Sequence, residues 1–397
     1  MTSVKTPLKF SNTSKWTTKT LEELAVLTSG VHLSPTEYSD SGDIPYFTGP
    51  SDITNNFNSV TKFTDKKAKT AKAGDIFIVV KGSGVGKTKI CELNEVFMGR
   101  QLMSLSASPS LSILIKATLD KNRHRLEALA MGNMIPGLSR NDILSIKISI
   151  PDDEVEQQKI ADFLTSVDTK ISQLTEKHHL LKEYKKGVMQ QIFSQKIRFK
   201  DKDGQAFPDW VVHPLSKLAS KITTKNKGRK IKAVLTNSAK HGIISQQDYF
   251  EKDIAREDNT DNYCVVNVDD FVYNPRISDL APVGPIGRNK VEQGIMSPLY
   301  TVFRINSDCC LDFYEYFFCS HLWHRYMYSI ANFGARHDRM NITSSDFMAL
   351  PCPSPCVQEQ QKIAEFLQSL DSKINAVAEQ IEQTKQFKKG LLQQMFV

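Results

Sequence analysis

The chain has 397 residues, which is long for one domain and sufficient for two to four. It is 40% hydrophobic and 24% charged, which excludes extensive disorder, and its net charge of +7 permits a polyanionic partner without requiring one. No apolar run approaches the ~20 residues of a membrane helix, and the start MTSVKTPLKF lacks the apolar stretch of a secretory signal. We therefore expect a cytoplasmic protein.

The seven cysteines show no spacing typical of a disulfide framework. An odd count without such spacing is typical of a reducing compartment. Cys352 and Cys356 are separated by three residues, but no second ligand pair stands near them. Because a structural zinc site needs four convergent ligands, we expect buried free thiols and no metal site.

The first part of the chain consists of a tail and a unit that mixes strands with helices. The tail comprises residues 1–15, and the first unit comprises residues 16–151. Within this unit, 75–80 and 143–150 have the pattern of strands, and 120–130 has the pattern of a helix. The mixture predicts an α+β domain.

A glycine-rich segment, KGSGVGKT at 81–88, follows the first of these strands. Gly86, Lys87 and Thr88 would supply the end of a phosphate-binding P-loop. However, Lys81 replaces the first glycine of that motif, and the residues after Thr88 alternate like a strand rather than a helix. We favour a hairpin whose lysines face DNA phosphates. The alternative is a nucleotide-dependent DNA-modifying enzyme that uses this loop.

A long helix is predicted over residues 152–195. Pro151 and the three acidic residues after it suit a helix N-terminus, and no proline interrupts the segment. Apolar residues recur at alternating steps of four and three, which is the spacing of a coiled-coil seam. The expected pairing residues are Ile160, Leu164, Val167, Ile171 and Leu174 here, and Ile363, Leu367, Leu370, Ile374 and Val377 in a copy near the C-terminus.

A linker, residues 196–209, leads to a second unit at 210–353. Strand-like runs occupy 262–268 and 300–305, and the aromatic-rich segment 311–331 has the pattern of a helix, so a second α+β domain is predicted. Aromatic side chains on this helix could stack on bases, but they pack more often into a core. These aromatics are Phe313, Phe317, Phe318 and Trp323.

The second long helix, residues 354–397, repeats the first. Residues 359–396 match residues 156–193 without a gap at an offset of 203, and 20 of the 38 positions are identical. WTTKTLEELA from Trp16 likewise parallels WVVHPLSKLA from Trp210. The chain is therefore a tandem duplication of one unit followed by one helix.

A narrow apolar seam on a long helix requires a second seam to cover it. The copy in the same chain supplies one, and the order domain, helix, domain, helix favours antiparallel pairing. We therefore predict an α+β fold in which two long antiparallel helices form a coiled coil that separates two mixed domains with pseudo-two-fold symmetry. Pairing of the helices between chains is the alternative.

No segment carries a complete catalytic motif. Asn274, Pro275 and Arg276 match only part of the N-P-P-aromatic signature of amino-methyltransferases, and no glycine-rich cofactor loop accompanies them. Glu183 and Lys185 lie on the long helix without an acidic partner that would complete a nuclease metal site. We therefore expect no catalytic residue. Basic clusters recur in both units, and a two-fold arrangement of basic domains suits a DNA duplex.

These features resemble the specificity subunit of type I restriction-modification enzymes. The resemblance covers nearly the whole chain and rests chiefly on the E-Q-Q-K-I-A-x-F-L segments that begin at Glu156 and Glu359. The second unit is also similar to one group of recognition domains through YNPR at 273–276, SPLYTVF at 297–303 and FGARHDRMNIT at 333–343.

The resemblance implies a non-catalytic reader of double-stranded DNA. Each target-recognition domain would read one half of a bipartite target, while the helices would set the spacer and recruit two adenine-N6 methyltransferase subunits. Restriction and translocase subunits would join that core, and S-adenosylmethionine, ATP and Mg²⁺ would belong to those partners. No cofactor in this chain and no membrane contact are expected. A coiled-coil scaffold that does not touch DNA is a further alternative.

Sequence-specific proteins read base edges mainly with Arg, Lys, Asn and Gln, and they position themselves with contacts to phosphates. On this basis we expect DNA contacts in both recognition domains. The expected residues are Tyr46, Lys81, Ser83, Lys87 and Arg100 in the first, and Arg276, Arg288, Lys290, Arg336 and Arg339 in the second.

Overall fold

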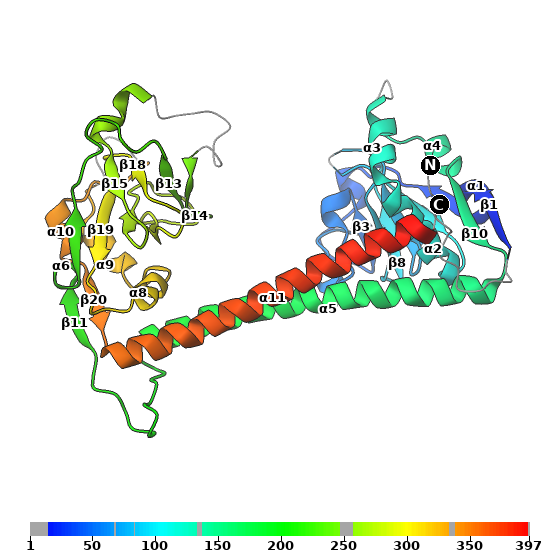
Figure 1. The fold of residues 1–397 in the computed structure, drawn as a ribbon. Coiled ribbons are helices and arrows are strands. Elements are labelled where there is room, and N and C mark those ends of the chain that lie inside the picture. The colour runs from blue at the N-terminus through cyan, green and yellow to red at the C-terminus, as the bar shows by residue number, and fades with distance from the viewer. Residues whose placement is uncertain are drawn as a thin grey trace, which may run out of the picture. The chain divides into compact units, whose positions relative to one another are not determined.

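The chain folds into two compact units, each with one mixed domain and a part of each long helix (Figure 1). The first unit comprises residues 1–177 and 377–397, and the second comprises residues 178–376. The computed structural model describes residues 15–66, 69–82, 84–132, 137–246, 257–332 and 338–395. The expected α+β fold is confirmed.

The first domain is built on small sheets. Its strands are β1 (Trp16–Thr20), β2 (Val26–Ser29), β3 (Ile44–Phe47), β4 (Phe63–Thr64), β5 (Thr70–Lys72), β6 (Ile76–Val79), β7 (Thr88–Ile90), β8 (Glu95–Met98), β9 (Leu102–Ser106) and β10 (Lys147–Pro151). Strands β1 and β10 form an antiparallel ribbon. One four-stranded sheet has the order β2-β9-β6-β7, and the other has the order β4-β3-β8-β5. All four residues of β3 and of β6 are buried, so these two strands carry the core.

The helices of the first domain are α1 (Leu21–Leu24), α2 (Pro109–Lys121), α3 (Arg123–Gly132) and α4 (Arg140–Leu144), with 3₁₀ turns η1 (Pro35–Glu37), η2 (Pro50–Asp52) and η3 (Phe57–Ser59). Helix α2 contacts β7 and β10, and α4 contacts β2. The single helix expected over 120–130 is wrong, because Asn122 ends α2. The amide and the side-chain Nδ2 of Asn122 both donate to the Thr118 carbonyl, at 3.0 and 2.9 Å, and α3 starts at the next residue.

The strand expected over 143–150 is correct only in its second half. A capping box starts α4: the Ser139 amide donates to the Asp142 carboxylate at 2.7 Å, and the Asp142 amide donates to the Ser139 hydroxyl at 3.1 Å. The resulting helical turn buries Ile143 completely. Strand β10 therefore begins only at Lys147.

The second domain repeats the plan of the first. Its strands are β11 (Val211–Pro214), β12 (Ala219–Ile222), β13 (Leu235–Ser238), β14 (Gly242–Ser245), β15 (Cys264–Val266), β16 (Phe271–Tyr273), β17 (Ile286–Arg288), β18 (Gly294–Met296), β19 (Thr301–Ile305) and β20 (Pro351–Ser354). The ribbon β11-β20 corresponds to β1-β10, and the sheet order β12-β19-β16-β17 corresponds to β2-β9-β6-β7. The two remaining pairs are β13-β14 and β15-β18.

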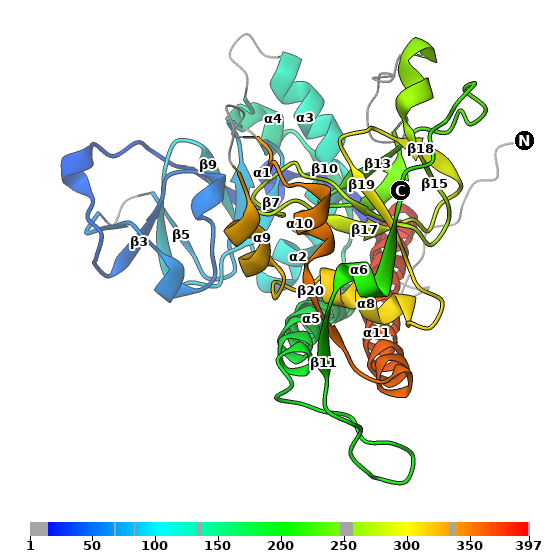
Figure 2. The same ribbon diagram turned by 90° about the vertical axis from the view of Figure 1, so that its left-hand side faces the viewer.

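The helices of the second domain are α6 (Leu215–Leu218), α8 (Leu311–Phe318), α9 (His324–Ile330) and α10 (Ser344–Met348), with the 3₁₀ turn η4 (Glu257–Asn262). Helix α6 follows β11 directly and contacts α10 (Figure 2). The segment expected as one helix over 311–331 is two helices, interrupted between Cys319 and Trp323. Its aromatics are core residues as expected, because Phe313, Phe317, Phe318 and Trp323 are all buried.

The two long helices are α5 (Glu154–Phe193) and α11 (Val357–Met395). In the first unit, the beginning of α5 and the end of α11 enter one apolar core, which includes Ile160, Leu164 and Met395. In the second unit, the end of α5 and the beginning of α11 do the same, with Ile192 and Ile363 in one core. The helices therefore pair antiparallel within a single chain in each unit.

The seam expected from the heptad spacing is buried, with one partial exception. Ile171 is half-buried, and the other nine residues are buried. The buried residues are Ile160, Leu164, Val167, Leu174, Ile363, Leu367, Leu370, Ile374 and Val377. The ring pair Phe163–Phe387, with centroids 6.5 Å apart, adds an aromatic contact between the helices in the first unit.

The cysteines form no disulfide bond. The seven cysteines are free, and burial is mixed: three are buried, and Cys319 is exposed. Among the described residues, no cluster of His, Cys, Asp and Glu is arranged to hold a metal ion. No helix in the described ranges has the length and apolar character that crossing a membrane requires.

Candidate nucleic-acid interface

The segment at 81–88 joins β6 to β7 in an antiparallel hairpin. The Gly86 amide donates to the Val79 carbonyl at 2.9 Å, and the Val79 amide donates to the Lys87 carbonyl at 3.0 Å. Gly84 and Gly86 have φ of 120° and 80°, which lie in the region that favours glycine. The expected glycine hairpin is confirmed, and both of its ends present an exposed lysine, Lys81 and Lys87.

This geometry removes the structural basis for a P-loop. A P-loop passes from its last glycine into a helix whose N-terminus faces the phosphates. Here Thr88 begins strand β7, and its hydroxyl donates to the Asp120 carboxylate of α2. The residue that would coordinate a nucleotide-bound metal is therefore engaged within the domain.

A surface hollow of about 620 Å³ lies beside the hairpin, lined by glycines of the loop and by helix α3. Lys87 and Arg123 both line it, and Arg123 forms an ion pair with Glu127 at 2.9 Å. Arg123 was not among the expected DNA-contacting residues. The basic run at 121–125 was the available signal, but the sequence does not reveal that α3 packs against the hairpin.

A second basic edge of the first domain is the turn between β8 and β9. Arg100 is exposed there, and Gln101 is half-buried. The Gln101 Oε1 atom lies only 2.4 Å from the place where a Cβ on Gly49 would stand, so Gly49 leaves room for this amide. Gln101 is a second residue that the sequence interpretation missed, and glutamine pairs well with adenine.

Tyr46 is placed in a core rather than on this surface. Its side chain is 1% exposed, and its hydroxyl accepts a hydrogen bond from the Leu33 amide at 3.2 Å. The ring packs against Tyr38 and Phe97, with centroid distances of 5.4 and 5.7 Å. Strand β3 lies between β4 and β8, which explains the burial of this residue.

In the second domain, Arg276 and Arg339 face each other in an antiparallel bridge. The Ile277 amide donates to the Asp338 carbonyl at 3.1 Å, and the Met340 amide donates to the Pro275 carbonyl at 3.0 Å. Two segments more than 60 positions apart in the sequence are thereby joined. Arg276 is exposed, whereas Arg339 is half-buried and holds Asp338 at 3.2 Å.

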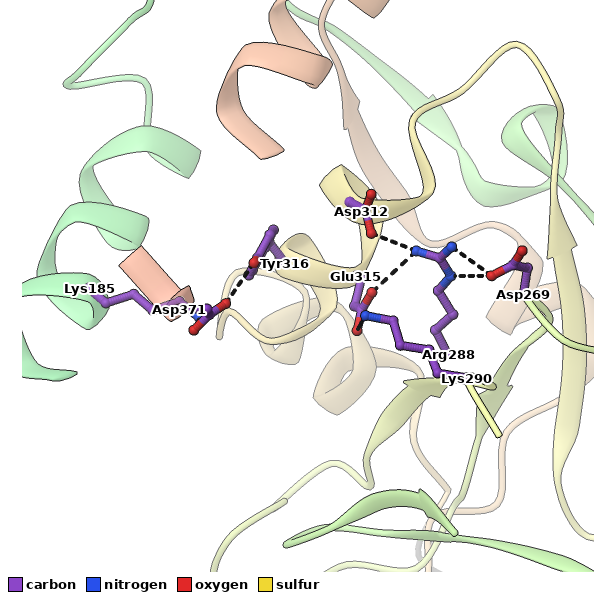
Figure 3. A network of polar contacts seen from close by, with 8 residues as sticks. All are labelled: Lys185, Asp269, Arg288, Lys290, Asp312, Glu315, Tyr316 and Asp371. Atoms are coloured by element: carbon purple, nitrogen blue, oxygen red, sulfur yellow. Dashed lines mark hydrogen bonds and ion pairs between the residues drawn. The ribbon is translucent and has the colours of Figure 1, made fainter. Parts of the chain in front are cut away.

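Arg288 is held by acidic side chains (Figure 3). Its guanidinium forms ion pairs with Asp269 at 2.6 Å, Asp312 at 2.7 Å and Glu315 at 3.4 Å, and its side chain is 12% exposed. Lys290 binds Glu315 at 2.8 Å and is more exposed. Arg288 therefore ties β17 to α8, and its charge is already compensated within the domain.

Two expected contact residues, Ser83 and Arg336, lie outside the described residues. Of the remaining eight, the structure brings Lys81 and Lys87 together on one hairpin and joins Arg276 to Arg339. Arg100 stands on the neighbouring β8-β9 turn, and Lys290 stands on the Arg288 network.

Known proteins match both halves of the chain. The type I restriction modification DNA specificity domain matches residues 13–183 and again residues 209–386. A protein of Mycoplasma genitalium named as a type I specificity subunit is 24% identical over 190 residues, which are 47% of this chain and 47% of that protein. A protein of Methanocaldococcus jannaschii named as the specificity subunit of type I restriction enzyme MjaX is 26% identical over 166 residues, 41% of this chain and 38% of that protein. The chain thus spans less than half the length of these curated relatives.

Solved structures share the fold. The crystal structure of the S subunit of a type I restriction-modification system from M. genitalium has a TM-score of 0.58 and 17% identity, and it covers 99% of both chains. A structure from work on complex assembly and conformational transition of the type I R-M system has a TM-score of 0.54 and 16% identity, and it covers 98% of this chain and 99% of that chain. Since the specificity domain matches twice and over most of the sequence, this chain belongs to the type I restriction modification DNA specificity family.

Proposed function

We propose that the chain is the non-catalytic subunit that selects the DNA target of a type I restriction-modification complex. Each domain reads one half of a bipartite double-stranded target. The observation that carries the proposal is the repetition of one fold with a basic hairpin in each copy, β6-β7 with Lys81 and Lys87 and β16-β17 with Arg276. Exposed cations on such a hairpin suit contacts with DNA phosphates and groove edges.

The long helices set the spacer between the half-sites and bind two adenine-N6 methyltransferase subunits. The duplication supports this assignment, because α5 and α11 offer the same segment twice and a duplicated surface suits two copies of one partner. Restriction and translocase subunits join the resulting core. S-adenosylmethionine, ATP and Mg²⁺ are used by those partners, and this chain supplies target selection.

Methylation mapping tests the proposal. The chain is produced together with its methyltransferase subunit in a host that lacks adenine methylation, and each subunit alone is the control. The expected result is adenine methylation at one two-part motif, and only when both subunits are present. Methyl transfer by the purified chain alone would overturn the non-catalytic assignment. Methylation that ignores sequence would overturn the role in target selection.

A domain exchange tests whether each domain reads its own half-site. Residues 16–151 are replaced by the first recognition domain of another family member, and the partner subunit is kept. Because each half-site is contacted by its own domain, only one half of the methylated motif should change. A change in both halves would contradict the assignment of one domain to each half-site.

A further inference from the structure

The hairpins of the two domains occupy equivalent places. Strands β6 and β16 hold the third position in sheets of the same order, β2-β9-β6-β7 and β12-β19-β16-β17. Just after the first strand of each hairpin, a carbonyl accepts a backbone hydrogen bond from a distant segment. Val80, one residue after β6, accepts from the Leu138 amide at 2.9 Å, and Pro275, two residues after β16, accepts from the Met340 amide at 3.0 Å. The next residue in each hairpin is basic, Lys81 in the first domain and Arg276 in the second.

The partners across these contacts differ. Arg339 precedes Met340 and forms the bridge with Arg276, whereas Gly137 precedes Leu138. The Lys81 side chain fills the space over Gly137, because a Cβ there would lie 3.1 Å from the Lys81 Cγ atom. The second domain thus places two arginines where the first places one lysine along a glycine.

The charges leave the Arg276 guanidinium available. Arg339 is paired with its neighbour Asp338, through Nε at 3.3 Å and a terminal nitrogen at 3.2 Å. Arg339 holds the pKa of the Asp338 carboxyl below its usual range, with a smaller contribution from Arg276. Within the described ranges, no side chain forms a hydrogen bond or an ion pair with the exposed Arg276 guanidinium.

Two buried asparagines fix the backbone of Arg276. The Arg276 amide donates to the Asn274 Oδ1 atom at 3.0 Å, and the Asn274 Nδ2 atom donates to the Asn237 carbonyl at 2.9 Å. Asn237 in turn donates to the Val272 carbonyl at 2.8 Å and to the Pro285 carbonyl at 3.1 Å. Asn274 is 7% exposed and Asn237 is 2% exposed. This chain of amides ties the start of the hairpin to β13, β16 and the segment before β17.

We propose that Arg276 reads a guanine in the second half of the DNA target, that Asn274 is the positioning residue that presets it, and that Lys81 binds a phosphate at the equivalent place in the first domain. The inference rests on the proposed function. The planar donors of arginine match the O6 and N7 acceptors of guanine, and such a pair needs a fixed approach. Lysine carries a point charge on a flexible stem, which suits a phosphate better than the paired acceptors of one base.

Selection from a pool of duplexes with randomised half-sites tests the assignment, using the full chain with its methyltransferase subunit. Arg276→Ala should reduce the preference for guanine at one position of the second half-site by roughly 5- to 150-fold, and other positions should keep their preference. Lys81→Ala should weaken all duplexes alike and lower the slope of log affinity against log salt by about one phosphate contact. Arg325→Ala, an exposed arginine on α9, is the control for charge loss and should change neither.

The outcomes distinguish a failure of the proposed function from a failure of the base-reading assignment to Arg276. If the unaltered complex selects no motif, the proposed function fails. If it selects a motif but Arg276→Ala weakens all sequences equally and lowers the salt slope, Arg276 binds a phosphate and the base-reading assignment is overturned. An unchanged motif and an unchanged affinity would also overturn it.

A double-mutant cycle tests the positioning role of Asn274. Asn274→Ala should relax the guanine preference at the same position as Arg276→Ala, and the double variant should lose no more preference than Arg276→Ala alone. A purely structural role would lower the melting temperature while the preference at that position persisted. That result, or additive losses of preference, would remove Asn274 from the readout.

Discussion

Lys185 binds Asp371 across the two long helices of the second unit, with an Nζ–Oδ1 distance of 2.5 Å. In the first unit, Lys388 binds Asp168 at the same distance. Lys388 and Asp371 stand 203 positions after Lys185 and Asp168, which is the offset of the sequence repeat. Each helix therefore gives a lysine to one pair and an aspartate to the other, as antiparallel pairing of duplicated helices requires.

The two ion pairs differ in what else they bind, and this predicts unequal effects. Asp371 also accepts a hydrogen bond from the Tyr316 hydroxyl at 2.6 Å (Figure 3). Asp371→Ala should therefore lower the free energy of unfolding by about 1–3 kcal/mol. Asp168→Ala should cost less than ~1 kcal/mol, because Asp168 is nearly half exposed. Urea unfolding of both variants measures the difference, and equal losses would contradict it.

A buried ion pair holds the linker against the start of α11. Glu359 is fully buried, and Arg198 binds both of its carboxylate oxygens, at 2.8 and 3.0 Å. The Trp210 indole donates to the same carboxylate at 2.9 Å. Arg198→Ala leaves this carboxylate without its cation, so we expect a loss of about 3–5 kcal/mol in the free energy of unfolding.

The exposed pair between Arg229 and Asp261, at 2.7 Å, provides a matched control. Both of these side chains are more than 40% exposed, so Arg229→Ala should cost less than ~1 kcal/mol. Denaturant titration of the two variants under one set of conditions gives the comparison. Similar costs would mean that burial does not set the strength of the linker contact.

The lowered pKa of His324 leads us to expect a loss of folding stability in acid. Burial, and to a lesser degree His321, lowers the pKa of His324 to about 4. The unfolded chain takes up a proton near the ordinary value of about 6.5, whereas the folded chain does so only near 4. Stability should therefore fall as the pH decreases from about 6.5 to about 4, and this contribution should level off below the lower value.

Substitution isolates that contribution. His324→Gln removes the titrating group and should flatten the dependence of the unfolding free energy on pH between these two values. His179→Gln, on the exposed face of α5, is the control and should leave the dependence as it is in the unaltered chain. Identical pH profiles for His324→Gln and the unaltered chain would exclude His324 as the source.

The architecture could be predicted because it depends on periodicity and repetition. The seam from Ile160 to Leu174 follows from a spacing that any long helix must satisfy, and the offset of 203 gives its partner. Helix and strand boundaries were less accessible. Asn122 and Ser139 end or start helices through local hydrogen bonds that a periodic pattern does not contain.

The candidate interface could be predicted from the sequence only where a local motif determines the structure. The hairpin with Lys81 and Lys87 follows from its glycines. The ion pairs of Arg288 could not be predicted, because its acidic partners stand 19, 24 and 27 positions away in the sequence. For the same reason, the sequence did not reveal that Arg276 and Arg339 face each other. Base contacts depend on such long-range neighbours.

In their proposed role, the two long helices act as a ruler between the half-sites. The seam repeats every seven residues, so the insertion of one heptad after Leu174 and one after Val377 keeps it in phase. Both insertions lie beside the boundary between the units, at residues 177 and 377, so both ion pairs between the helices keep their partners. The helix pair becomes longer by roughly 10 Å, at ~1.5 Å per residue.

DNA advances roughly 34–36 Å per turn of about 10 base pairs, so the spacer between the half-sites should grow by about three base pairs. The half-site sequences should stay the same, because the recognition domains are untouched. The added base pairs also rotate one half-site by roughly a third of a turn, so weaker binding is compatible with the ruler.

Methylation mapping of the insertion variant gives the spacer directly. A heptad in only one helix breaks the match between the two copies and is the control, which should abolish specific methylation. If the double insertion kept the original spacer at full strength, the helices would not set the distance.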